Sequence, residues 1–416
     1  MRVTGKAMIV AALLTAGCSA FHAAPLPGAQ SAQSGAWPKV LQGGSGGQWI
    51  MFTPPGGGLP TGIAQGADDS VWFAELGFNG GQKSALVRVN NRGTFSRSIM
   101  LPDSAPAELV AGADGKFYLS DVFEPEIVVV DPRGGVVTLA IDRQAISLTR
   151  GPDGNVWFAD GDDVGYVTPD GVVKSYPLSP IAFSEGITTG PDANIWFTDG
   201  RSDSVWMLQP ATGAMTRYPL GPNDLACILP EDIVAAGDGY LYFTCLAGSI
   251  GKIDLHGHVI RFVSVPERLR GHMIPGPKPL QRPFFTTAHG IHHIFSDGTI
   301  AGNENPAVSP ILIATMLDGN IWFSAQGNEI GVLVRQVMTV SPASLELSNV
   351  GVTAPISVSE VYYHGTYWAS TSNASVATPG PVADGMVTVT AVGSGSCTIT
   401  VHDGIGNSVD VAVTVL

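Results

Sequence analysis

The residues best suited to chemistry by type and spacing are three nearby histidines, His289, His292 and His293. Imidazole nitrogens can bind a metal ion or act as a general base near neutral pH. His292 and His293 are adjacent, so in a strand their side chains point to opposite faces, whereas His289 and His292 could meet around a turn at Gly290. The alternative is that all three are ordinary solvent-exposed histidines. The chain has no His-Glu-x-x-His motif, no Cys-x-x-Cys pair and no phosphate loop.

The four cysteines offer a second kind of chemistry. Cys227 precedes one predicted strand and Cys245 follows the next, so in an exported chain these two could form a disulfide. Cys397 falls inside a predicted strand near the C-terminus, which favours a buried free thiol. Cys18 follows an apolar run in the sequence Leu-Thr-Ala-Gly-Cys.

Residues 1–17 have the features of a secretory signal peptide, with basic residues, an apolar run and then small residues. The segment ending in Cys18 resembles the lipobox of bacterial lipoproteins, in which this cysteine carries the lipid. The other reading is an ordinary signal peptide with a chance cysteine. The resemblance implies an exported cell-envelope lipoprotein of the outer membrane, facing the periplasm or the surface and held by lipid alone. Residues 18–47 are rich in Ala, Ser, Gln, Pro and Gly and predict a flexible tether.

One short motif recurs along most of the chain. Its clearest copy is Gly-Pro-Asp-Gly-Asn-Val-Trp-Phe at 151–158, an Asp-Gly turn that opens an apolar strand. The copies recur about every 40 residues, as in repeat proteins made of strands. Their aromatic anchors are taken as Trp72, Phe117, Trp157, Trp196, Tyr242 and Trp322.

These repeats predict an all-β fold, with a seven-bladed β-propeller over 48–335 and one degenerate blade at 283–287. The strand at 49–52 has no turn unit before it, so we expect it to complete the last blade and close the ring. The aromatic anchors are interpreted as packing between blades rather than as a sugar-binding surface. Trp206 and Trp368 fall outside the repeat and are the better ligand candidates.

Residues 338–416 have a different texture, with few aromatic residues and alternating strand-like runs. This pattern predicts a small β-sandwich. The runs at 369–377, 385–395 and 409–415 resemble the bacterial immunoglobulin-like domains (BIG type 2) of surface proteins. The resemblance implies an Ig-like spacer or adhesive module without chemistry of its own.

The propeller repeat at 151–178 resembles that of the virginiamycin B lyase (streptogramin lyase) family. Its members open a cyclic depsipeptide antibiotic at its ester by elimination, with Mg²⁺ and a His base near the central axis. The resemblance is specific for this type of propeller and weak for the reaction, because relatives share the blades without the activity.

The resemblance also implies that two positions in each blade face the axis. The first position is occupied by Thr61, Ala107, Ile146, Glu185, Glu231, His272 and Ile311. The second is occupied by Glu75, Ser120, Asp160, Asp199, Cys245, Thr287 and Ala325. The base and acidic partner of the lyases match Ile311 and Ala325, which can neither take a proton nor bind a cation.

Two functions follow as hypotheses. The first is a binding scaffold without lyase activity. The alternative is a metal-assisted carbon–oxygen lyase with His272 as base and Glu185, Glu231 and Asp199 as metal ligands. No cofactor is firmly implied; Mg²⁺ or Ca²⁺ would suit the acidic side chains, which could equally be satisfied by backbone N–H groups and water.

The charge of the chain narrows the choice of partners. It has 21 Lys and Arg against 35 Asp and Glu, a formal charge of −14, which disfavours nucleic acid. We expect a monomer that binds a small molecule, a glycan or a protein at the propeller face. No apolar run beyond the N-terminal one is long enough to span a membrane.

Overall fold

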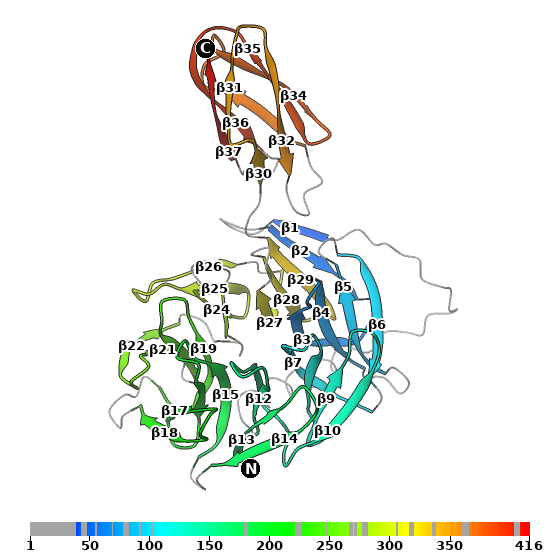
Figure 1. Ribbon diagram of the computed structural model, residues 1–416, viewed down its shortest axis with the longest axis vertical. Helices are drawn as coiled ribbons and strands as arrows, with labels where there is room; N and C mark the ends of the chain where they lie inside the picture. The colour runs from blue at the N-terminus through cyan, green and yellow to red at the C-terminus, as the bar shows by residue number, and fades with distance from the viewer. Residues whose placement is uncertain are drawn as a thin grey trace, which may run out of the picture. The chain divides into compact units, whose positions relative to one another are not determined.

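The computed structural model of the 416-residue chain is all-β (Figure 1). It describes residues 39–42, 48–54, 56–68, 70–77, 83–90, 93–101, 103–178, 182–220, 227–246, 248–265, 269, 273–276, 282–304, 307–315, 320–334, 338–359, 366–402 and 408–416. Two compact units account for them, one containing Met51–Leu333 and the other Val334–Leu416. No helix able to cross a membrane is found in these parts of the chain.

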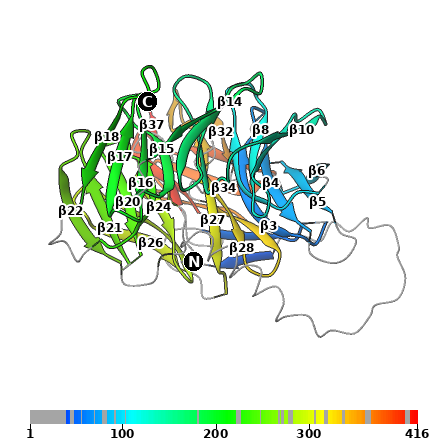
Figure 2. The same ribbon diagram turned by 90° about the horizontal axis from the view of Figure 1, so that it is seen from below.

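The first unit is built from sheets of consecutive antiparallel strands, each running from an inner to an outer strand (Figures 1 and 2). The first three sheets are β3 (Leu59–Gln65), β4 (Val71–Leu76), β5 (Ser84–Val89) and β6 (Phe95–Leu101); β7 (Pro106–Ala111), β8 (Phe117–Asp121), β9 (Glu126–Val130) and β10 (Val136–Ala140); β11 (Ser147–Arg150), β12 (Val156–Ala159), β13 (Asp163–Val167) and β14 (Val173–Pro177). The next three are β15 (Ser184–Thr189), β16 (Ile195–Asp199), β17 (Ser204–Leu208) and β18 (Met215–Pro219); β19 (Pro230–Ala235), β20 (Leu241–Cys245), β21 (Ser249–Ile253) and β22 (Val259–Ser264); β23 (Met273–Pro275), β24 (Pro283–Thr286), β25 (Gly290–Ile294) and β26 (Ile300–Glu304).

The last sheet joins the two ends of this unit. Its strands are β27 (Pro310–Thr315), β28 (Ile321–Ala325) and β29 (Glu329–Val334), followed outward by β2 (Gln48–Phe52) and β1 (Lys39–Gln42). The strand at 49–52 therefore lies in the last sheet, as its sequence context predicted. The inner strands β3, β7, β11, β15, β19, β23 and β27 contact one another in this order, and β27 contacts β3. The sheets thus form a closed ring, in which the short inner edge of each sheet is protected by the neighbouring inner strands.

In four of the repeats a hydrogen bond joins the turn to the aromatic anchor. The Nε1 of Trp157 donates to the carboxylate of Asp153 at 3.2 Å, and the hydroxyl of Tyr118 donates to Asp114 at 3.0 Å. The same bond joins Trp196 to Asp192 and Tyr242 to Asp238. The anchor of the second repeat is therefore Tyr118 and not Phe117. Phenylalanine cannot replace it fully, because it lacks the hydroxyl that donates to Asp114.

The anchors also pack neighbouring sheets together, as the sequence indicated. Trp157 is fully buried against Ile187 and Phe197 of the next sheet. Trp196 in turn packs with Phe243 of the sheet after it. Because a buried Trp replaced by Ala costs about 3–5 kcal/mol, this repeated contact stabilises the ring substantially.

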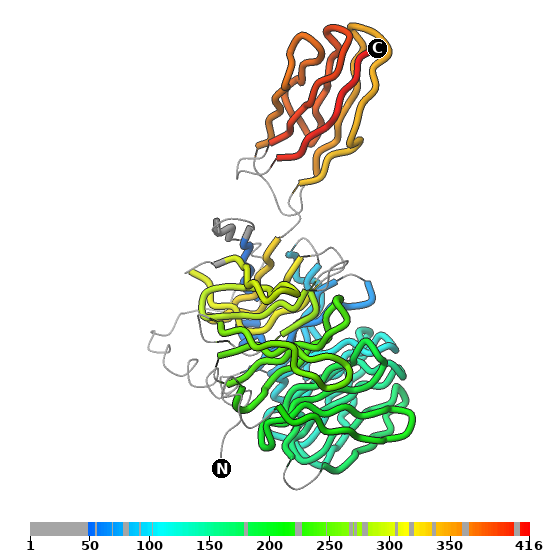
Figure 3. The backbone as a smooth tube through the Cα atoms, turned by 90° about the vertical axis from the view of Figure 1, so that its left-hand side faces the viewer, coloured from blue at the N-terminus to red at the C-terminus, as the bar shows by residue number. Residues whose placement is uncertain are grey.

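The second unit consists of two four-stranded sheets (Figure 3). Their strands are β30 (Thr339–Ser341), β32 (Thr353–Ser359), β35 (Met386–Ala391) and β34 (Ala377–Ala383), and β31 (Ser344–Leu347), β37 (Ser408–Val415), β36 (Gly395–His402) and β33 (Trp368–Thr371). Alternate residues of these strands enter one apolar core that includes Ile356, Val389, Ile399 and Val413. The sheets therefore enclose one core between them, with polar residues outside. Cys397 is a buried free thiol in this unit.

Candidate functional site

The expected site residues lie at one edge of the sheets, where the second strand ends opposite the start of the inner strand. The pairs Pro60–Glu75, Ser184–Asp199, Pro230–Cys245 and Pro310–Ala325 occupy equivalent positions in four sheets. The loops that precede each inner strand meet the same edge. Side chains from several sheets are therefore brought to one face of the ring.

A hydroxyl group shapes the inner strand just below this edge. The inner strands β7 and β15 carry a register shift, and the bulged N–H groups of Glu108 and Gly186 donate to the hydroxyls of Ser120 and Thr198 at 3.0 and 2.9 Å. The N–H of Asp232 is bound in the same way by Thr244, and that of Leu312 by Ser324. Ser120 is therefore a structural hydroxyl that pins the bulge.

The residue at the expected edge position in the second sheet is Asp121, which pairs with Pro106. The expectation for Ser120 was wrong by one residue, because it was aligned on Phe117 instead of Tyr118. The carboxylate of Asp121 accepts the backbone N–H groups of Ala105, Phe123 and Glu124 at 2.6, 2.8 and 3.0 Å. It therefore holds two loops together at this edge.

Glu75 and Asp160 are two buried carboxyl groups at this edge with unmet hydrogen-bonding capacity. Each is 4% exposed, and Glu75 Oε1 and Asp160 Oδ2 have no hydrogen-bond partner. Desolvation by burial raises the pKa of Glu75 to about 7. Burial likewise raises the pKa of Asp160 to about 7, although the N–H of Asp163 donates to its other oxygen at 2.8 Å. Both groups therefore exchange protons near neutral pH.

Thr61 adds a third polar atom of this kind. It lies on β3 next to Pro60, the cross-strand partner of Glu75, and its buried Oγ1 has no hydrogen-bond partner. A Cβ atom on Gly56 would come 2.1 Å from Glu75 Oε2, so only glycine fits beside this carboxylate. Buried polar atoms in native proteins are nearly always satisfied, so this part of the ring suits water or a polar ligand.

Asp199 has a structural role. Its Oδ1 accepts the N–H groups of Phe183, Arg201 and Ser202 at 2.9, 3.0 and 3.1 Å. Its Oδ2 accepts the hydroxyl of Ser202 and the Nε1 of Trp206, the latter at 3.0 Å. Both oxygens are therefore engaged in holding the loop after β16. Trp206 is engaged with them and is not a free aromatic platform.

Glu185 and Glu231, the other two expected metal ligands, lie on the neighbouring inner strands β15 and β19. Glu185 is buried beside Gly200, where a Cβ atom would come 2.5 Å from Glu185 Oε1. The backbone oxygen of Glu231 accepts the hydroxyl of Thr198 at 2.8 Å. Across the described ranges, no three His, Cys, Asp or Glu side chains converge to hold a metal ion. Cation binding by Glu185, Glu231 and Asp199 stays a prediction.

The histidines divide into two groups. His272, the expected base, lies outside the described residues. His292 stacks on Phe285 and His293 on Phe284, so the two rings point to opposite faces of β25 as the sequence indicated. His292 Nε2 also lies 3.1 Å from Thr287 Oγ1. These two rings are therefore packed into the sheet.

The last sheet is apolar at the two positions where the sequence resemblance led us to look for a base and an acidic partner. Ile311 is 3% exposed and packs with Leu59, Leu76 and Ala105 of neighbouring elements. Ala325, at the edge position of β28, is 1% exposed. Neither side chain has an ionisable group, and their surroundings are hydrocarbon.

A disulfide closes the edge position of the fifth sheet. Cys227 and Cys245 are bonded, with their Cα atoms 5.1 Å apart. Cys227 belongs to the segment before β19, and Cys245 ends β20. The bond therefore ties that loop to the second strand, as the hydrogen bonds of Asp121 and Asp199 do in their sheets.

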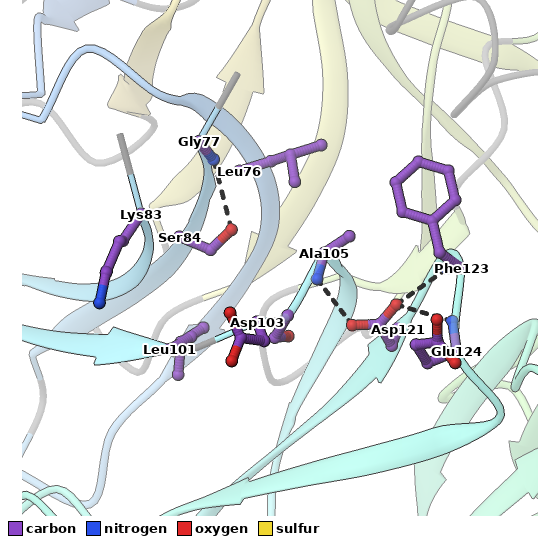
Figure 4. A pocket seen from close by; sticks show the side chains of 11 residues that line it. Leu76, Gly77, Lys83, Ser84, Leu101, Asp103, Ala105, Asp121, Phe123 and Glu124 are labelled. Carbon is purple, nitrogen blue, oxygen red and sulfur yellow. Dashed lines mark hydrogen bonds between the residues drawn. The ribbon is translucent and has the colours of Figure 1, made fainter. Parts of the chain in front are cut away.

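A pocket of about 340 Å³ opens between the first two sheets, next to Asp121 (Figure 4). Its apolar lining comes from Leu76, Leu101 and Ala105, whose neighbours Gly77, Ser84 and Ser104 contribute polar atoms. Its charged lining comes from Lys83, Asp103, Asp121 and Glu124, with the exposed ring of Phe123 beside them. The pocket therefore combines an apolar base with three carboxylates and one ammonium group.

The comparisons with known proteins agree with this architecture. A model of the virginiamycin B lyase family matches residues 93–271. A streptogramin B lyase structure superposes with a TM-score of 0.59 and 24% identity, covering 69% of this chain and 97% of that chain. Virginiamycin B lyase from Staphylococcus aureus superposes with a TM-score of 0.59 and 22% identity, covering 68% of this chain and 98% of that chain. No curated protein matches the chain.

Two further structures are informative. A catalytically inactive His-to-Ala variant of virginiamycin B lyase from Staphylococcus aureus with quinupristin is 20% identical, with a TM-score of 0.59 and 68% of this chain covered by 99% of that one. The extracellular domain of a hybrid two-component system from B. thetaiotaomicron superposes with a TM-score of 0.54 and 11% identity. The match covers 91% of this chain and 61% of that chain. At these identities the likeness shows the fold, a virginiamycin B lyase-like β-propeller.

Proposed function

We propose that this chain is an exported, lipid-anchored surface protein whose propeller is a binding scaffold without lyase activity. The propeller has seven blades in this proposal, since the inner strands β3, β7, β11, β15, β19, β23 and β27 follow one another around the ring. The second unit, with two sheets around one core, is proposed to be the Ig-like domain that its sequence resembles.

The observation that carries the proposal is the apolar packing of Ile311 and Ala325. One similar structure is described as catalytically inactive because of a single His-to-Ala change, which makes a histidine essential in that lyase. The positions that match the lyases' base and acid are filled here by Ile311, packed on Leu59 and Leu76, and by Ala325. An alkyl side chain cannot abstract a proton, so the elimination would lack its base.

The binding role is supported by the pocket at the same edge. Lys83, Asp103 and Glu124 line it and make no ion pair among the residues that the structure describes. With three carboxylates, one ammonium group and an apolar base of Leu76 and Leu101, it suits a small cationic or zwitterionic ligand. Asp121 supports this geometry by fixing the loops on both sides.

Export and lipid attachment are proposed from the sequence of residues 1–18, which lie outside the described residues. Metabolic labelling with radioactive palmitate tests the lipid attachment at Cys18. Label that is incorporated into the chain and lost in Cys18→Ser is expected. Label that persists in Cys18→Ser contradicts the lipoprotein assignment.

The absence of lyase activity is tested directly. The full chain is incubated with Mg²⁺ and quinupristin, and the opened depsipeptide is followed by mass spectrometry. We expect no turnover above the rate without protein. Turnover that disappears in His272→Ala would overturn the proposal and establish the metal-assisted alternative, whose ligands would be Glu185, Glu231 and Asp199.

A further inference from the structure

The second unit has a tryptophan, Trp368, that lies on its surface and not in its core. Trp368 begins β33 and is 50% exposed, whereas Trp49, Trp157, Trp196 and Trp322 of the chain are fully buried. A single exposed apolar side chain is common on protein surfaces and does not by itself mark a binding site. The surroundings of this ring show what kind of partner it suits.

The ring is held in one orientation. Trp368 lies directly opposite His402 across β33 and β36, and the two rings stack at 5.4 Å with an angle of 14°. His402 Nε2 lies 3.0 Å from the hydroxyl of Ser370, which fixes the imidazole in turn. Since the imidazole covers one face of the indole, the exposed surface is the opposite face and the edge. The indole is therefore a rigid, flat, apolar platform.

Hydroxyl groups and one carboxylate share the face of the sheet with this platform. The register pairs Ser370 with Thr400, and Thr400 with Asp410. The hydroxyl of Thr400 donates to Asp410 Oδ1 at 2.7 Å, which orients the carboxylate and leaves its second oxygen for another donor. Ser408 lies beside His402 at the same end of the sheet. Neighbouring positions are about 5 Å apart across strands and about 7 Å along them, the size of one or two sugar rings.

The charge of this face excludes other partner classes. The strands β31, β33, β36 and β37 contain no Lys or Arg, and their acidic residues are Glu346 and Asp410. A polyanion such as nucleic acid or a sulfated glycan would be repelled. A neutral partner with many hydroxyl donors and one apolar face fits better.

We propose that this face of the second unit binds a neutral saccharide. The C–H face of a pyranose ring lies on the open face of Trp368, where it buries apolar surface on the indole. Asp410 Oδ2 accepts a sugar hydroxyl, a hydrogen bond strengthened by the charge of the carboxylate. Ser370 and Ser408 offer further polar atoms around the ring. The competing reading is a cross-strand pair that only stabilises the sheet.

The test uses the full chain and three neutral hexasaccharides, namely cellohexaose, maltohexaose and chitohexaose, with binding measured by isothermal titration calorimetry. At least one should bind, and Trp368→Ala should weaken that binding about tenfold or more. Trp368→Phe should retain part of the affinity. Met386→Ala removes a side chain of similar exposure, 42%, from the other sheet and should bind as the parent does.

Asp410→Asn keeps the proposal testable if Trp368→Ala fails to fold. It preserves the shape of the side chain, so the thermal midpoint should stay unchanged while the affinity falls about threefold to tenfold. Binding to none of the three hexasaccharides overturns the proposal, as does equal binding by the parent, Trp368→Ala and Asp410→Asn. Variants of the propeller, such as His272→Ala, should leave this binding unchanged, which separates it from the proposed function of that unit.

Discussion

The Nε1 of Trp157 donates a hydrogen bond to the carboxylate of Asp153, four residues earlier in the same repeat, at 3.2 Å. The carboxylate also accepts the N–H of Asn155 at 3.1 Å, so it closes the turn and orients the indole at once. The indole then packs on Phe197 of the next sheet. Local turn chemistry and inter-sheet packing are therefore coupled through one side chain.

This coupling predicts a cost for removing the donor alone. Tyr118→Phe keeps the ring but removes the hydroxyl that donates to Asp114, so the free energy of unfolding should fall by about 1–2 kcal/mol. Urea denaturation measures the change. The control is Tyr166→Phe, since the described residues show no hydrogen bond to that hydroxyl. Equal stability of the two variants would contradict the role of the Asp–Tyr pair.

The strand that closes the ring predicts a larger effect. Phe52 of β2 is 5% exposed and stacks on Trp322 at 5.5 Å and 12°. Phe52→Ala should lower the free energy of unfolding by about 3–5 kcal/mol, because it removes a buried ring at the seam of the sheet. The matched control Phe123→Ala changes a ring that is 58% exposed and should have little effect. An unchanged melting temperature for Phe52→Ala would refute closure through β2.

The disulfide predicts a redox dependence confined to one unit. Reduction of Cys227–Cys245, separated by 18 residues, should destabilise the propeller by about 3 kcal/mol. The unfolding transition of the second unit should not move, since its cysteine, Cys397, is a free thiol. Calorimetry with and without dithiothreitol, and with Cys227→Ser, measures both transitions. A reductant that shifts both transitions equally argues against this assignment.

Glu75 predicts the direction of a pH effect. Burial raises its pKa from 4.5 to about 7, so between these values the folded state holds a proton that the unfolded state releases. The stabilisation of the folded state by this proton is fully present below about pH 4.5 and is lost as the pH rises through 7. From pH 5 to pH 8 the free energy of unfolding of the parent should fall by about 1–3 kcal/mol more than that of Glu75→Gln. Denaturation of both proteins at the two pH values measures this difference. The control Glu346→Gln, on the other unit, should show the same pH dependence of stability as the parent. If Glu75→Gln also showed the parent's pH dependence, the proposed buried proton on Glu75 would be contradicted.

The repeat and its strands could be predicted because turn residues and apolar alternation are local signals. The position of 49–52 in the last sheet followed from its lack of a turn unit. The anchor of the second repeat was misread, because Phe117 and Tyr118 are both aromatic. Counted from the turn Asp, as Trp157 is from Asp153, the anchor position four residues later falls on Tyr118. The hydrogen bond, and not the ring, identifies Tyr118.

The candidate site could be predicted only as a set of positions. Asp160 and Asp199 occupy equivalent positions, yet one has an oxygen without a partner and the other has both oxygens occupied. The difference comes from the loops that follow each strand and from Trp206, which donates to Asp199. Spacing places a carboxylate at an edge, but its partners depend on how the adjoining loops fold, which the repeat does not specify.

The placement of β2 beside β29 has a mechanical consequence. A pull on the chain ahead of β1 reaches the ring at this one pair of strands, because β29 is the strand that joins β1 and β2 to the rest of the sheet. The resistance of the whole propeller to such a load is therefore that of a single seam, and peeling it would open the ring before any other sheet is strained.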